Sequence, residues 1–168
     1  IKEGIFFFSF SGCSSLTSIT VSKENKVYDS RENSNAIIHT ESNTLIRGCE
    51  KTIIPPSVTE IGKYAFCDCS SLTSISIPSS VMEIGNRAFS GCSSLARITV
   101  FKDNKVYDSR EDSNAIIHTE SNTLILGCKN TIIPPSVTEI GTGAFHGCSG
   151  LTDISIPELV NKIGFCAF

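Results

Sequence analysis

Residues 19–62 read ITVSKENKVYDSRENSNAIIHTESNTLIRGCEKTIIPPSVTEIG, and residues 98–141 read ITVFKDNKVYDSREDSNAIIHTESNTLILGCKNTIIPPSVTEIG. The two segments start 79 positions apart and are identical at 38 of 44 positions. They differ only at the paired positions 22/101, 24/103, 33/112, 47/126, 50/129 and 51/130. Self-similarity at a fixed period is typical of repeat architectures, in which each unit packs mainly against its neighbours. Each residue of this chain is therefore interpreted first as a repeat position and only then as a candidate for chemistry.

A shorter repeat lies inside the long one. Segment 62–78, GKYAFCDCSSLTSISIP, returns at 85–101 and at 141–157, with an aromatic residue, a cysteine, a leucine and an isoleucine at intervals of three. These positions hold Phe10, Phe66, Phe89, Phe145 and Phe168; Cys13, Cys69, Cys92 and Cys148; Leu16, Leu72, Leu95 and Leu151; and Ile19, Ile75, Ile98 and Ile154. Apolar and polar residues alternate after each leucine, which predicts a short strand with one buried face.

The strands define six units, which we call rungs. The second apolar residues of their strands are Val21, Ile54, Ile77, Val100, Ile133 and Ile156. Successive spacings are 33, 23, 23, 33 and 23, so one 33-residue unit and two 23-residue units make up the 79-residue period. A strand this short cannot bury its apolar face alone, and we expect the rungs to stack as a parallel sheet. The ladder should end where proline follows the strand, at Pro55, Pro78, Pro134 and Pro157.

The segments that return from one strand to the next are of two kinds. In the 23-residue units the return reads SVxEIGxxAFxxC, which predicts a 3₁₀ or irregular turn with Val81, Ile84, Phe89 and Cys92 pointing inward. In the 33-residue units, residues 36–46 and 115–125 read AIIHTESNTLI, two β-rich runs around a polar break. This pattern predicts a β-hairpin that projects from the stack or covers its convex side, within inserts near 22–51 and 101–130.

The pattern IPxSVxxIGxxAFxxCxxLTxIxIP, together with the insert YDSRxxxNAII…NTLIxGCxxTxIPxSV, resembles the BspA-like, or Treponema-type, leucine-rich repeats. The resemblance implies a mainly-β repeat solenoid, a leucine-rich-repeat-like right-handed stack of about six rungs with a parallel sheet and two inserted hairpins. It also implies a secreted or cell-surface bacterial protein used for adhesion, with some members binding extracellular-matrix proteins of a host. The start, IKEGIFFFSF, departs from the pattern because no IG precedes Phe10, and we expect an irregular or truncated first return.

Composition favours one domain and disfavours several partners. The 168 residues leave no linker between repeats, so we expect a single solenoid domain over 1–168. Both ends stop inside a repeat, which suggests a fragment of a longer protein. The formal charge of −3 provides no basic stripe for nucleic acid. No apolar run, including IFFF at 5–8, approaches the ~18 residues of a membrane span.

Most of the eight cysteines occupy repeat positions, which argues against a disulfide framework. Cys49 and Cys128 share one position, and Cys13, Cys69, Cys92 and Cys148 share another, so their side chains should point the same way. Disulfides need converging Cβ vectors, and free buried thiols that act as small apolar groups are favoured. Cys67 and Cys166 lie off these positions, and we expect them to be the most exposed thiols.

Metal sites and cofactors are disfavoured. The CDC run at 67–69 offers two ligands, whereas a structural zinc needs four, usually in two separated pairs. His39, His118 and His146 are interpreted as solvated polar residues. The runs DSRENSN at 29–35 and DSREDSN at 108–114 lack the register of a calcium loop. We expect ordered turns there, in which Asp29 or Asp108 accepts backbone N–H bonds.

Nothing in the sequence predicts catalysis, and no catalytic residue is assigned. Most serines are repeat positions, and no nucleophile elbow or phosphate-binding loop occurs. Paired carboxylates for glycoside hydrolysis remain an alternative, but Glu60, Glu83 and Glu139 recur as turn residues before IG, which favours a solvated role.

Two surfaces are candidates for binding. The solvent-facing strand positions form two stripes: Thr20, Ile53, Ser76, Thr99, Ile132 and Ser155, and, two residues earlier, Ser18, Lys51, Ser74, Arg97, Asn130 and Asp153. The second stripe varies in charge between similar rungs, as a recognition surface or a drifting solvated surface would. The hairpin tips at 39–43 and 118–122 are identical in sequence, with His39, Glu41, Asn43, His118, Glu120 and Asn122 as candidate contacts. Two equal epitopes would allow bivalent attachment, although each hairpin could merely shield the stack.

Three functional hypotheses follow. The first is a non-catalytic adhesion module that binds a host matrix protein, a cell-surface protein or a glycan over an extended face, without a cofactor. The second is an architectural spacer that presents another domain. The third is an accessory domain of a glycan-acting surface enzyme.

Overall fold

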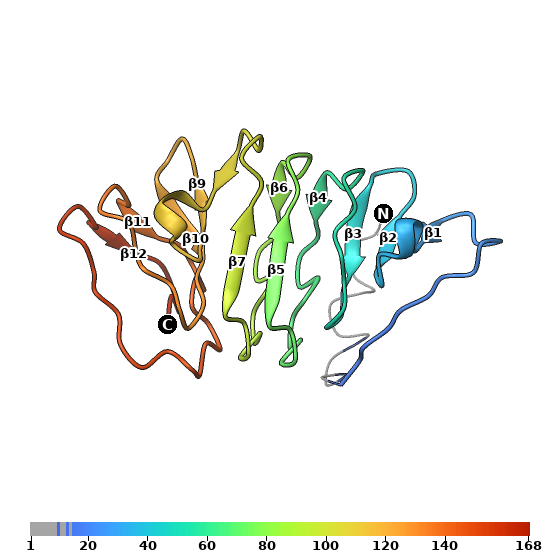
Figure 1. The fold of residues 1–168 in the computed structure, drawn as a ribbon, viewed down its shortest axis with the longest axis horizontal. Helices are drawn as coiled ribbons and strands as arrows, with labels where there is room; N and C mark the ends of the chain where they lie inside the picture. Colours follow the sequence, from blue (N-terminus) through green and yellow to red (C-terminus); the bar gives the residue numbers. More distant parts are fainter. Residues whose placement is uncertain (1–9, 11–12, 14) are drawn as a thin grey trace.

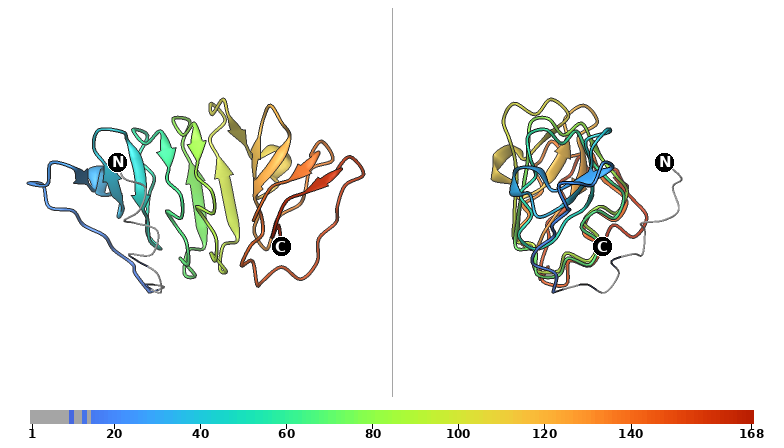
Figure 2. Two further views of the ribbon diagram at one scale, coloured as in Figure 1. Left: turned by 180° about the vertical axis from the view of Figure 1, so that it is seen from behind. Right: turned by 90° about the vertical axis from the view of Figure 1, so that its right-hand side faces the viewer.

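The structure is a computed structural model that describes Phe10, Cys13 and residues 15–168. The chain forms an elongated stack of β-rich turns (Figure 1), and the view along the stack shows successive turns superposed on one another (Figure 2). The predicted fold class, a mainly-β repeat solenoid with parallel strands, is confirmed. Apart from Phe10, the irregular start predicted for residues 1–10 lies outside the described residues.

The predicted rung strands are clearest in the two adjacent 23-residue units. Strand β5 (Ser74–Ile77) pairs in parallel with β7 (Arg97–Val100), with Ser74 opposite Arg97 and Ile77 opposite Val100. Exposed and buried residues alternate along both strands. Because every second side chain faces the interior, the alternating pattern in the sequence was sufficient to predict which face is buried.

The prediction of one parallel sheet through all six rungs is wrong. In the described residues the rung ladder contains only β5 and β7. In the 33-residue units, backbone N–H groups that could extend the ladder donate instead to the inserted chain. The Ile53 N–H donates to the Ser34 carbonyl, 3.0 Å away, and the Ile132 N–H donates to the Ser113 carbonyl, also 3.0 Å away. In the first rung, the Val21 N–H likewise donates to the insert, to the Ser30 hydroxyl 2.9 Å away.

The return segments contain a second parallel ladder that the sequence analysis assigned to 3₁₀ or irregular structure. Its strands are β4 (Glu60–Ile61), β6 (Glu83–Ile84), β11 (Glu139–Ile140) and β12 (Lys162–Ile163). β4 pairs with β6, and β11 pairs with β12, each in parallel. The inward orientation was nevertheless correct, because Val81, Phe89 and Cys92 are buried and Ile84 is partly buried against the core.

The two predicted hairpins are present, but they do not project. β2 (Ile37–His39) pairs antiparallel with β3 (Thr44–Arg47), and β9 (Ile116–His118) pairs in the same way with β10 (Thr123–Leu126). Short strands β1 (Tyr28–Asp29) and β8 (Tyr107–Asp108) extend each hairpin, and the 3₁₀ turns η1 (Arg31–Asn33) and η2 (Arg110–Asp112) follow them.

Each hairpin is built into the return ladder. β3 pairs in parallel with β4, and β10 with β11, which creates mixed sheets of order β1-β2-β3-β4-β6 and β12-β11-β10-β9-β8. Ile38 and Leu45 of the first hairpin are completely buried. The hairpins therefore supply core residues, which a projecting loop would not do.

Aromatic rings stack along the core. The Phe66 and Phe89 rings lie 4.9 Å apart between centroids at 7° between planes, and Phe145 and Phe168 lie 5.2 Å apart at 2°. The core residues form two clusters, and the second hairpin contributes to both: Ile116 and Leu126 belong to one, and Ile117 and Leu124 to the other.

All eight cysteines are free thiols in the structure. Cys49, Cys69, Cys92 and Cys128 are buried, as expected, whereas Cys148 is half-buried and Cys13 is exposed. Cys166 is exposed as expected, but the prediction that Cys67 is among the most exposed thiols is wrong. Cys67 is half-buried, and this burial raises the pKa of its thiol.

Candidate interaction surface

The solvent side of the rungs carries the first candidate surface. We call it the rung face and define it as the twelve positions identified from the sequence. These are Ser18, Thr20, Lys51, Ile53, Ser74, Ser76, Arg97, Thr99, Asn130, Ile132, Asp153 and Ser155. All twelve are exposed. In β5 and β7, strand alternation turns their neighbours into the core, whereas in the last rung Ile156, which the sequence predicted to be buried, is 42% exposed.

Two large apolar side chains interrupt this otherwise polar face. We call each 79-residue period a super-repeat. Ile53 and Ile132, at equivalent positions of the two super-repeats, expose 71% and 73% of their surface. Ile132 lies with Asp153 and Ser155 in a shallow groove of about 320 Å³ between segments 131–133 and 153–157. The structure thus brings three of the candidate residues together around one depression that combines an aliphatic surface, a carboxylate and a hydroxyl.

The hairpin tips are only partly available. Glu41 and Glu120 are exposed, whereas His118 is half-buried. His39 is 7% exposed, so its place among the exposed tip residues is a wrong prediction. The backbone N–H of Ser42 donates to His39 Nδ1, 3.2 Å away, and the Tyr28 ring meets the imidazole edge-on with centroids 5.7 Å apart.

Asn43 and Asn122 are half-buried and already engaged. Arg31 Nη1 donates to Asn43 Oδ1 at 2.7 Å, and Arg110 Nη1 donates to Asn122 Oδ1 at 2.8 Å. Both asparagines have positive φ, 54° and 52°, a conformation that asparagine tolerates better than most residues. Their amides therefore shape the tip rather than present free groups to a ligand.

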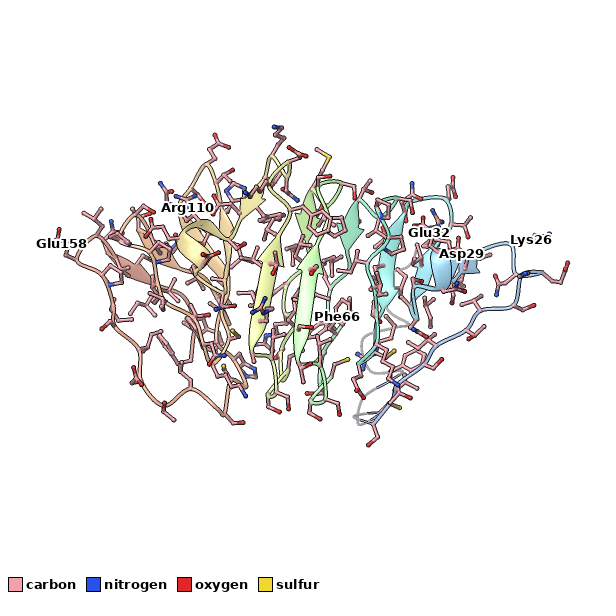
Figure 3. All side chains as sticks on the ribbon, viewed as in Figure 1. Lys26, Asp29, Glu32, Phe66, Arg110 and Glu158 are labelled. Carbon is pink, nitrogen blue, oxygen red and sulfur yellow. The ribbon has the colours of Figure 1, made fainter. Side chains whose placement is uncertain are left out.

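The acidic runs after β1 and β8 are ordered turns, as predicted. The Arg31 N–H donates to Asp29 Oδ1 at 3.0 Å, and the Arg110 N–H donates to Asp108 Oδ1 at 3.1 Å. The sequence analysis missed that the same arginine also binds the carboxylate with its side chain, at 2.7 Å from Nη2 to Oδ2 in each copy. These hydrogen bonds from Arg31 hold the pKa of Asp29 below its ordinary value. Figure 3 labels Asp29 and Arg110 near opposite ends of the stack.

Histidine and cysteine chemistry does not converge in the described part of the chain. No group of three His, Cys, Asp or Glu residues there could hold a metal ion. His146 is exposed, and its Nδ1 lies 2.8 Å from the Ser90 hydroxyl, while its carbonyl accepts a hydrogen bond from the Gly91 N–H. This side chain joins two turns that are far apart in sequence.

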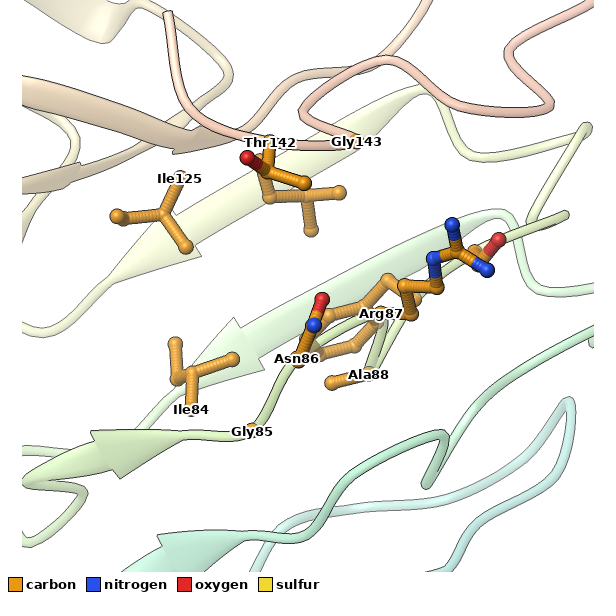
Figure 4. Close-up of a pocket in the computed structure, with 11 residues that line it drawn as sticks. Ile84, Gly85, Asn86, Arg87, Ala88, Ile125, Thr142 and Gly143 are labelled. Atoms are coloured by element: carbon orange, nitrogen blue, oxygen red, sulfur yellow. The ribbon is translucent and has the colours of Figure 1, made fainter. Parts of the chain in front are cut away.

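A small cavity lies where these two turns meet. It measures about 80 Å³ and is lined by residues such as Ile84, Arg87, Ile125 and Thr142 (Figure 4). The space arises because the second 33-residue unit has no AFxxC turn at this level. Its size suits a few water molecules rather than a substrate.

A larger groove escaped the sequence analysis. It is lined by segments 99–103 and 108–112, has a volume of about 700 Å³ and includes the half-exposed Phe101. The only signal in the sequence was the replacement of Ser22 by phenylalanine in the second copy.

No helix among the described residues has the length and hydropathy needed to cross a bilayer.

These features define a leucine-rich repeat solenoid with an open, variable surface. The chain belongs to the family described as the BspA type leucine rich repeat region, whose repeats match six times over residues 3–114 and 116–168. No curated protein matches the chain.

Solved structures of bacterial leucine-rich repeat proteins are similar to this chain. A leucine rich cell surface protein from Faecalibacterium prausnitzii is 35% identical, with a TM-score of 0.57 over 68% of this chain and 31% of its own. A leucine-rich repeat protein from Eubacterium ventriosum is 20% identical, with a TM-score of 0.49 over 100% of this chain and 55% of its own. The chain therefore spans about a third and about half of the lengths of these two proteins.

Proposed function

We propose that this chain is a non-catalytic interaction module of a bacterial cell-surface protein and that it binds a host matrix or cell-surface protein through the rung face. Its similarity to a protein described as a leucine rich cell surface protein supports the location. The repeat family supports a role in binding rather than catalysis.

The observation that carries the proposal is the exposure of Ile53 and Ile132, at 71% and 73%, on a face whose charges vary. An exposed aliphatic side chain contributes nothing to the core, whereas its full burial in an interface contributes about 1.5–3 kcal/mol. Lys51 and Asn130 precede these isoleucines by two positions, so equivalent apolar contacts have different electrostatic surroundings. Such variation on a fixed frame can provide selectivity between partners.

Binding of the chain to a panel of immobilised extracellular-matrix proteins and glycans tests the proposal. We expect Ile132→Ser, Arg97→Glu and Asp153→Lys each to weaken binding by about tenfold or more, as at interface positions of central importance. Glu158→Lys is the matched control, because Glu158 is an exposed acid on the same rung as Asp153 but lies outside the rung face. Unchanged binding by all three rung-face variants would contradict the proposal and favour a spacer.

A further inference from the structure

A groove of about 700 Å³ opens beside η2 in the second super-repeat. Segments 99–103 and 108–112 line it, so the site does not depend on a neighbouring unit. Phe101, which directly follows β7, exposes 54% of its surface there. A large apolar side chain exposed inside a groove and surrounded by polar groups is typical of a binding site, whereas isolated exposed apolar residues are common elsewhere. The groove meets the rung face only at Thr99.

The groove is negatively charged. Its charged lining residues are Lys102, Asp103, Asp108, Arg110, Glu111 and Asp112. Arg110 is neutralised by Asp108, with Nη2 2.7 Å from Oδ2, so Lys102 alone faces the remaining three carboxylates. These three are exposed, and in the described part of the chain neither Asp103 nor Asp112 has an ion pair or hydrogen bond. Uncompensated carboxylates beside an aromatic ring match a cationic partner with an apolar side chain.

The first super-repeat contains the same backbone frame with a different lining. Glu32 has φ 56° and ψ 27°, and its counterpart Glu111 has φ 56° and ψ 30°. The hydrogen bond from Val100 N–H to the Ser109 hydroxyl, 3.0 Å, repeats that from Val21 to Ser30, 2.9 Å. The two copies therefore differ here in their side chains and not in their backbone conformation.

The sequence differences between the copies are concentrated at this groove. Of the six differing pairs, 22/101, 24/103 and 33/112 have their second member in the lining. Ser22 becomes Phe101, which adds the aromatic surface, and Asn33 becomes Asp112, which adds a charge; the pair 24/103 keeps its carboxylate. The second copy is thus more apolar and more acidic than the first at equivalent positions.

We propose that the groove binds an extended basic segment of a partner protein. An apolar side chain of that segment packs on Phe101, while lysine or arginine side chains face Asp103, Glu111 and Asp112. The aromatic face adds a cation–π contact, and the carboxylates add charge-assisted hydrogen bonds. The proposal rests on the proposed function, because it assumes an interaction module, but it does not require the rung face to be the main contact.

Short dye-labelled peptides provide the probe, with affinity for the 168-residue chain measured by fluorescence anisotropy. In the first peptide lysines stand two residues before and after a leucine, so that both kinds of side chain share one face of the extended chain. In the second peptide serine replaces the leucine, and in the third glutamate replaces each lysine. We expect the leucine–lysine peptide to bind about tenfold tighter than the serine–lysine peptide, because only the former covers Phe101. The glutamate peptide should not bind, and added salt should weaken the lysine peptide because the carboxylates are exposed.

The first super-repeat supplies variants that the fold already accommodates. Phe101→Ser and Asp112→Asn install its residues in the second copy, so both should fold; the former should weaken the leucine–lysine peptide by about tenfold and the latter by a few-fold. Glu111→Gln should also weaken binding, whereas Glu32→Gln, the same change at the equivalent position, should not. Ser22→Phe combined with Asn33→Asp should create a second site, which would raise the peptide stoichiometry from one to two per chain.

The outcomes separate this proposal from the function proposed above. Equal affinity of the leucine–lysine and serine–lysine peptides would overturn it, since it would indicate a nonspecific charge effect. Unchanged peptide binding by Phe101→Ser, or no peptide binding to the wild-type chain, would overturn it as well. The rung-face variants Arg97→Glu and Asp153→Lys should leave peptide binding intact. A groove that binds peptide in a chain whose rung face binds no matrix protein would support this proposal and contradict the other.

Discussion

The 23-residue and 33-residue units differ most where the chain turns back toward the rung strand. In a 23-residue unit, the Phe66 N–H donates to the Ala88 carbonyl and the ring stacks on Phe89. In a 33-residue unit, Gly48 takes the same place, because its N–H donates to the Ala65 carbonyl in the same way. A Cβ on Gly48 would lie 2.2 Å from Cε1 of Phe66, so the absence of a side chain admits the neighbouring ring.

The comparison shows that length is added on one side of the stack and removed on the other. From Gly48 the chain reaches Thr52 in four residues, whereas from Phe66 it reaches the equivalent Ile75 in nine. The 33-residue unit therefore gains a hairpin and loses the AFxxC turn. Across the second such gap, the turns after Phe89 and Phe145 touch directly, since the Gly91 N–H donates to the His146 carbonyl at 3.2 Å. Units of unequal length can stack on one another because each unit needs only to continue the shared core.

Removing a stacked ring should have the largest effect. Phe89→Ala should lower the free energy of unfolding by about 3–5 kcal/mol, because the buried ring packs against Phe66 and the fold cannot collapse fully around the space. Chemical denaturation followed by circular dichroism measures this change. Ser76→Ala, on the exposed side of β5, should be nearly silent and serves as the control. A cost below about 1 kcal/mol for Phe89→Ala would argue against a stacked core.

Alkaline pH should distinguish the buried cysteine positions from exposed thiols. Burial raises the pKa of Cys69 from 9.0 to about 11. Below pH 9 both folded and unfolded chains keep the proton; above it the unfolded chain loses the proton first, so stability should fall by about 2–3 kcal/mol as pH rises toward 11.

Urea unfolding between pH 8 and 11 in the presence of a reductant tests the effect of Cys69. The Cys69→Ala chain should lose less stability over this range than the wild type. Cys166→Ala, at an exposed thiol, should follow the wild-type profile. Identical slopes for the Cys69→Ala chain and the wild type would contradict the assigned burial.

Adding a methyl group to the glycine of a 33-residue unit should have a smaller effect. Gly127→Ala places Cβ 2.1 Å from Cε1 of Phe145, whose ring is held against Phe168. We expect a loss of about 1–3 kcal/mol from overpacking. Gly150→Ala is the matched control, because its Cβ would meet only the flexible Lys129 side chain at 3.2 Å. Equal thermal midpoints for the two variants would show that the ring does not require the glycine.

The sequence predicted the features that depend on local alternation and on repetition. The strand pattern of β5 and β7, the hairpins and the exposure of all twelve rung-face residues follow from side-chain periodicity. It did not predict the return ladder, because strands as short as β4 and β6 are too brief to show a period. The burial of His39 also depends on a distant partner, Tyr28, which no local pattern indicates. The groove at Phe101 required the three-dimensional relation between β7 and η2.

The second hairpin has a mechanical consequence. Its alternate side chains enter the core clusters on both sides, Ile116 and Leu126 in one and Ile117 and Leu124 in the other. A pulling force along the molecule would cross this junction through interleaved aliphatic groups as well as through the parallel pairing of β10 with β11. This shared hairpin should raise the force needed to separate the two super-repeats, and they should unfold together rather than one after the other.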